Sequence, residues 1–265
     1  MKVRSLSVTI LPALAAALLV AAQETSTSPV APQPRPKSQK EVEAIMAIVN
    51  AQDPDSRIKA AEELVRNFAD TEFKAFALQM ATISAQQKND NENVLIYGER
   101  TLEADPNNYT AMIIMAQTLA QTTREFDLDR EEKLKRVEGY ANKAIQLLEK
   151  APRPNPNITD QQWEEAKRDF RSQAFEALGI AEMVRKNYDR AIAHFKTAID
   201  VAGTPNAPTK IRLGAALNLS GKHDEAIAVL DEVMADAQLN PQLRSFAQAE
   251  RLRAVQAKEA KSKQQ

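Results

Sequence analysis

The chain has 265 residues, of which 43% are hydrophobic and 5% aromatic, with only 6 glycines and no cysteine. So few aromatic residues and glycines disfavour a β-sandwich or β-barrel, and the lack of cysteine excludes disulfide bonds, thiol catalysis and cysteine-based zinc sites. The 35 basic and 36 acidic residues nearly cancel, so the composition does not predict a nucleic-acid partner, which would require a basic excess.

Residues 1–22 have the pattern of a Sec-type signal peptide, with a positive start at Lys2 and Arg4, an apolar run, and small residues just before Gln23. We therefore expect a periplasmic or secreted protein that makes no stable membrane insertion after signal cleavage. A lipid anchor is not expected, because no cysteine follows the signal. The open alternative is a membrane-tethered assembly factor that keeps an uncleaved N-terminal helix.

Residues 23–39 combine prolines with serine, threonine and glutamine, a composition that disfavours helix and cannot pack a core. We expect a disordered tether there. From residue 40 to 258, apolar residues recur three and four positions apart, which predicts a continuous helical domain. The polar end of the chain, 259–265, is expected to be a disordered tail.

One internal break interrupts this pattern, the segment PRPNPN at residues 152–157. Thr159 follows it and Gln162 stands three positions further on, which is the spacing of a capping box. The pair predicts the start of a long helix, which runs through Trp163 into the clearest of the internal repeats.

The strongest internal repetition lies toward the C-terminal end. Gly179, preceded by leucine, returns 35 positions later as Gly214, and Ala191 returns at the same offset as Ala226. This order of small and apolar residues resembles the tetratricopeptide repeat, a helix–turn–helix unit of about 34 residues. The resemblance implies that the two glycines lie where the helices of one unit cross closely, and that Phe195 plugs into the next unit.

On this resemblance the chain is identified as a member of the tetratricopeptide repeat family, similar to exported bacterial proteins that carry such repeats. The resemblance implies an all-α fold, a right-handed α-α superhelix in which antiparallel helix pairs stack as a solenoid. The implied units are a helix pair over 40–70, repeats near 72–106, 109–150, 172–205 and 207–240, and an end helix at 241–257.

The resemblance also implies a function, the binding of a protein or peptide by a scaffold or adaptor in the cell envelope. Stacked units present their first helices on a concave wall, where amides bind an extended backbone and aliphatic residues hold its side chains. Mapped onto this sequence, the candidate groove consists of Gln79, Ile83, Gln86, Ile113, Gln117, Gln121, Glu176, Ile180, Met183, Ile211 and Asn218.

No catalytic, cofactor-binding or metal-binding residues are predicted, and we expect neither an enzyme nor a small-molecule substrate. The two histidines, His194 and His223, are expected to face solvent, without a second group that would make a site. Asp127 and Asp129 alternate as in a calcium loop, but the central glycine of such a loop is missing.

A second class of function stays open, an enzyme-associated subunit or a degenerate hydrolase that acts on envelope polymers. Its carboxylates would be Glu164 and Glu165 together with Asp127 and Asp129. Such chemistry needs two carboxyl groups that converge in one cleft, with the pKa of one of them raised.

Overall fold

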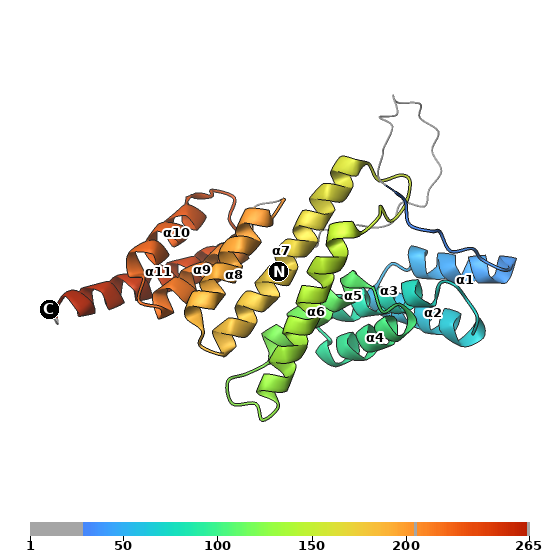
Figure 1. The fold of residues 1–265 in the computed structure, drawn as a ribbon, viewed down its shortest axis with the longest axis horizontal. Helices are drawn as coiled ribbons and strands as arrows, with labels where there is room; N and C mark the ends of the chain where they lie inside the picture. Colours follow the sequence, from blue (N-terminus) through green and yellow to red (C-terminus); the bar gives the residue numbers. More distant parts are fainter. Residues whose placement is uncertain (1–28, 204–205, 264–265) are drawn as a thin grey trace.

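The computed structural model describes residues 29–203 and 206–263, and these residues contain eleven α-helices and no strand (Figure 1). The expected signal peptide, 1–22, lies outside the described residues. In chain order the helices are α1 (Gln39–Asn50), α2 (Pro54–Asn67), α3 (Lys74–Gln87), α4 (Asn91–Ala104), α5 (Tyr109–Thr122), α6 (Arg130–Lys150), α7 (Asp160–Val184), α8 (Tyr188–Val201), α9 (Ala207–Leu219), α10 (His223–Ala235) and α11 (Pro241–Ser262).

The helices pack in consecutive pairs, α1 with α2, α3 with α4, α5 with α6, α7 with α8 and α9 with α10, and α11 closes the stack. Each second helix also packs on the first helix of the next pair, so the core runs through the stack from one pair to the next. The predicted all-α solenoid is confirmed. Within the described ranges, no helix combines the length and the apolar character that crossing a bilayer requires.

Helix starts and turns follow from local residue chemistry. Asp53, Asn108 and Asn206 each accept a backbone N–H of the following helix, which satisfies a group that the helix itself leaves unbonded. The predicted capping box is confirmed, since Thr159 accepts the Gln162 N–H at 3.2 Å and Gln162 accepts the Thr159 N–H at 3.0 Å.

The turns inside three of the pairs each contain a residue with a positive φ angle. Asn89 lies between α3 and α4, Lys186 between α7 and α8, and Gly221 between α9 and α10, with φ values of 57°, 64° and 78°. A residue in the left-handed region of φ at this place ends a helix and lets the chain reverse direction. The recurrence of this turn is independent structural evidence for repeated units.

The expected close crossings are confirmed. A Cβ added at Gly179 would lie 2.5 Å from Cε1 of Phe195, and one added at Gly214 would lie 2.7 Å from Cγ of Leu230. Phe195 therefore fills the space inside its own pair, in addition to joining a cluster shared with α9. The α3–α4 pair has Thr82 at this place, and its hydroxyl group lies 3.3 Å from that of Thr101, so a buried polar contact replaces the glycine.

Two expectations at the chain ends differ from the structure. Residues 29–38, which fall within the expected disordered tether, run as an extended N-terminal strap from α1 to the loop between α6 and α7 (Figure 1). Prolines keep this segment out of a helix, but an extended chain still hydrogen-bonds through its remaining main-chain groups. At the other end, α11 continues to Ser262, into the expected tail, because Lys and Ala are good helix formers.

Candidate protein-binding surface

The first helices of successive pairs are the elements that position the predicted groove, and we call their shared side the first-helix wall. Of these helices, α1 packs on α3, α3 on α5, and α5 on α7. The wall is therefore continuous over the first four pairs. The predicted groove residues fall on α3, α5, α7 and α9, but the structure gives them three different roles.

Two of the predicted residues are core residues. Ile113 is 1% exposed and belongs to a cluster formed by α5, α6 and α7. Ile211 is 9% exposed and packs with Leu230 and Ala247 of α10 and α11. Assigning these residues to a ligand-binding surface is therefore wrong: an adjacent helix covers each of them.

Two predicted amides already have partners within the protein. Gln79 Oε1 accepts a hydrogen bond from Asn108 Nδ2 at 2.8 Å, which joins α3 to the start of α5. Asn218 Oδ1 lies 2.9 Å from His223 Nδ1, across the turn between α9 and α10. These amide oxygens hold neighbouring elements in place, and a ligand would have to break those contacts to use the oxygens.

Glu176 also serves an internal contact. Glu176 is 8% exposed as a residue, and its carboxylate accepts the Thr209 hydroxyl at 2.9 Å and pairs with Arg212 at 2.5 Å. The three residues connect α7 to α9, the first helices of neighbouring pairs. Because Arg212 is neutralised by Glu176, it does not offer a free cation to the terminal carboxylate of a peptide.

The remaining predicted residues are accessible. Gln86 and Gln121 are exposed, and Gln117 is half-buried. Ile83, Ile180 and Met183 are partly buried and pack along the core clusters with part of each side chain outside. The accessible part of the first-helix wall is thus amide-rich on α3 and α5 and aliphatic on α7.

An ionic network that the sequence did not predict joins α6 to α7. Arg185 pairs with Glu138 at 2.5 Å, with Glu131 at 2.8 Å and with Glu182 at 3.1 Å. Glu182 is 2% exposed and also accepts Asn187 Nδ2 at 2.8 Å. Burial lowers the pKa of the Arg185 guanidinium, but the bonds to Glu131 and Glu138 outweigh it, so the pKa lies above its ordinary range.

The histidines do not both face solvent as expected. His194 is half-buried on α8 and its ring stacks on that of Phe175, with centroids 6.4 Å apart and an interplanar angle of 26°. Burial lowers the pKa of His194. Apolar packing explains both features, because the first helix of the pair covers this side of α8.

The acidic pairs of the hydrolase alternative lie apart from each other. Glu164 and Glu165 are exposed near the start of α7, where Glu164 pairs with Lys167. Asp127 and Asp129 lie in the α5–α6 loop. The backbone N–H of the preceding turn lowers the pKa of Asp127, the opposite of what a general acid needs. Over the described residues, no group of three or more potential metal-binding side chains comes together.

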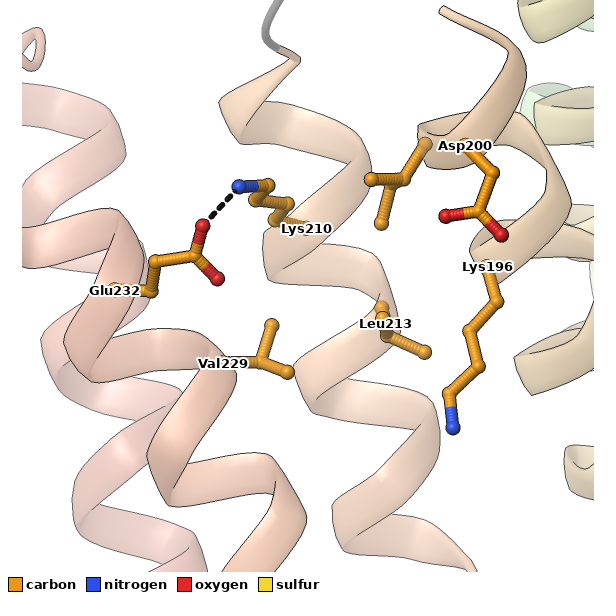
Figure 2. A pocket seen from close by; sticks show the side chains of 7 residues that line it. Lys196, Asp200, Lys210, Leu213, Val229 and Glu232 are labelled. Carbon is orange, nitrogen blue, oxygen red and sulfur yellow. Dashed lines mark hydrogen bonds and ion pairs between the residues drawn. The ribbon is translucent and has the colours of Figure 1, made fainter.

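A hollow of about 360 Å³ lies between the second helices α8 and α10, with α9 at its base (Figure 2). Ile199, Leu213 and Val229 form its apolar part, and Lys196 and Asp200 stand at its rim. A bond of 2.5 Å between Lys210 and Glu232 spans one side. None of the accessible residues of the first-helix wall lines this hollow, so the hollow and the wall are separate surfaces.

The stacked pairs and the accessible wall define a helical repeat protein of the solenoid class. The model of the tetratricopeptide repeat family matches residues 185–250, from the α7–α8 turn into α11. The curated proteins contain no match to the chain.

Among solved structures, the chain is similar to a thermophilic TPR protein of Thermus thermophilus, with 16% identity, 81% of this chain and 96% of that chain covered, and a TM-score of 0.49. It is also similar to a tetratricopeptide repeat protein of Parabacteroides merdae, with 17% identity, coverage of 85% and 93%, and a TM-score of 0.42. A third similar structure is that of MamA, with 19% identity, coverage of 69% and 96%, and a TM-score of 0.37.

Proposed function

We propose that the protein is an exported, non-catalytic scaffold or adaptor that holds another protein or a peptide on its first-helix wall, within the cell envelope. The observation that carries this proposal is the stack itself. Five helix pairs follow one another with their first helices side by side over four pairs, and stacked repeats of this kind create extended binding surfaces.

The chemistry of the accessible wall supports an extended segment or a helix as the ligand. Gln86, Gln117 and Gln121 offer amide donors and acceptors for a main chain, and Ile83 and Met183 offer apolar contact. Few charges lie among these residues, so association depends little on salt. Because none of these five residues is aromatic, we expect an affinity in the micromolar range, or about −8 kcal/mol.

Photo-crosslinking in intact cells tests the wall directly. A photoreactive residue at Gln117 or Gln121 is expected to capture a partner, whereas the same residue at Gln146, an exposed glutamine on the second helix α6, is not. Replacing both wall residues, Gln117→Glu and Gln121→Glu, should abolish capture and leave the helical circular dichroism unchanged. Equal capture from Gln146 would reject the wall as the binding surface.

The export part of the proposal depends on the signal-like pattern of residues 1–22 and has its own test. A reporter that is active only outside the cytoplasm, fused after Gln265, should be active, and N-terminal sequencing should find a mature chain that starts at or near Gln23. A full-length chain that stays in the cytoplasm would contradict export without affecting the binding proposal.

A further inference from the structure

The first residues of the N-terminal strap are held through their main chain, by a loop far along the sequence. The Arg153 N–H donates to the Pro29 carbonyl oxygen at 2.9 Å, and the Ala31 N–H donates to the Arg153 carbonyl oxygen at 2.8 Å. These two bonds make a parallel β-bridge between Val30 and Arg153. The strap therefore adds a short extended segment to the loop between α6 and α7, residues 151–159.

The loop is positioned by the body of the protein. The Arg153 side chain donates to the Ile158 carbonyl oxygen at 2.7 Å, pairs with Asp160 at 3.3 Å, and is 5% exposed as a residue. The indole N–H of Trp163 donates to the Ala151 carbonyl oxygen at 3.0 Å. The N–H and carbonyl groups that pair with the strap thus belong to a loop that is already ordered by other contacts.

The strap contributes few side-chain contacts. Residues 32–38 are exposed, and only Val30 and Ala31 are half-buried. Gln33 donates to the Pro154 carbonyl oxygen at 2.9 Å, and the ion pair of Lys37 near α1 is largely solvated. Recognition at the loop therefore requires a carbonyl group at the first position and an N–H at the third.

We propose that the α6–α7 loop is a peptide-binding site at the edge of the solenoid, distinct from the first-helix wall, and that residues 29–31 occupy it in cis. The ligand in trans is an extended, proline-flanked segment of a partner with the chemistry of Pro-Val-Ala-Pro, which adds to the loop as a strand and displaces the strap. Because residues 32–38 join the cis segment to α1, its effective concentration at the loop is of the order of millimolar, so the strap competes strongly with such a ligand.

Ala31→Pro in the full chain tests the site, because proline removes the N–H that donates to Arg153 and keeps the extended backbone. The probe is a fluorescein-labelled synthetic peptide of residues 29–37, and its control peptide carries proline at the position of Ala31. Fluorescence anisotropy should show that the Ala31→Pro protein binds the probe about tenfold or more tightly than the wild type does, since its site is vacant more often. Pro32→Ala, which leaves both bonds in place, should behave as the wild type.

Hydrogen–deuterium exchange gives a second readout. The segment 151–159 should exchange faster in Ala31→Pro, and saturating probe should restore its protection. Gln33→Ala, which removes the bond to Pro154, should shift probe binding in the same direction by a smaller factor. Circular dichroism should be unchanged in both variants, because these positions lie outside the helices.

Three results would overturn the proposal. Equal probe affinity in the wild type and in Ala31→Pro would show that the strap does not occupy a binding site. Equal affinity for the probe and its proline control would show that the β-bridge is not the mode of recognition. A wild-type dimer that becomes a monomer in Ala31→Pro would show that a second copy supplies the segment, so occupancy in cis would be rejected.

Discussion

The ring of Phe195 occupies the space beside Gly179 that a side chain would need, since an added Cβ would lie 2.5 Å from its Cε1 atom. The two residues belong to α7 and α8, the helices of one pair. Their contact brings the two helix axes close and buries the ring, which is 1% exposed. Gly214 and Leu230 repeat the same relationship in the following pair.

Gly179→Ala should destabilise the protein although alanine is the better helix former. Overpacking of a filled crossing costs about 1–3 kcal/mol, and the gain in helix propensity offsets at most about 1 kcal/mol of it. Urea unfolding followed by circular dichroism measures the difference. The matched control is Gly139→Ala on α6, where an added Cβ meets nothing within 4 Å, and it should raise stability by about 0.5–1 kcal/mol. Equal stabilisation by both substitutions would show that the crossing has room.

Arg185→Met should be one of the most damaging substitutions outside the apolar core. It leaves Glu182, which is 2% exposed, with fewer partners in a buried place. Breaking a buried ion pair costs roughly 3 kcal/mol, and Asn187 and Arg190 limit the loss because their contacts with Glu182 remain. Thermal or urea unfolding measures the effect. The control is Lys222→Met, which removes a solvated ion pair with Asp189 and should change the free energy of unfolding by less than about 1 kcal/mol. Similar losses of stability in the two variants would contradict a special role for Arg185.

His194 should make stability fall at mildly acidic pH. Burial lowers its pKa below the ordinary value of about 6.5, so below that pH the unfolded chain binds a proton that the folded chain accepts less readily. The free energy of unfolding should therefore drop as pH falls from about 6.5 toward the lower pKa of the folded state. His194→Phe keeps an aromatic ring on Phe175 and should remove this part of the pH dependence. Urea midpoints measured between pH 7.5 and 5.5 that run parallel for both proteins would contradict the prediction.

The phenol of Tyr97 should lose its proton at a higher pH than an ordinary tyrosine does. Burial, together with its hydrogen bond of 2.6 Å to Glu62, raises the pKa of Tyr97 to about 12. Since the folded state favours the neutral phenol, this group stabilises the fold below about pH 10, and the contribution is lost as pH rises toward 12. Ultraviolet absorbance of tyrosinate in the native protein should show a late phase that becomes smaller in Tyr97→Phe. An identical titration curve in the variant would exclude the assignment.

The sequence alone determined the class of fold and several local details. The recurrence of Gly179 as Gly214 predicted close crossings because glycine is the residue that lets two helices touch in this way, and both crossings are present. Thr159 and Gln162 predicted the start of a helix because a capping box depends on residues only three positions apart. Such features are local, or they repeat at a fixed period, so residue types and spacing suffice to find them.

Only the tertiary structure decided which residues remain available for binding. Ile113 and Gln117 lie one helical turn apart on α5, yet the first is a core residue and the second is only half-buried. The helical period identifies which residues share one face of a helix. Whether that face is buried depends on the distance and tilt of the next helix pair. The β-bridge between Val30 and Arg153 could not be predicted from the sequence either. Its two hydrogen bonds join main-chain groups, and every residue type except proline carries both the N–H and the carbonyl group.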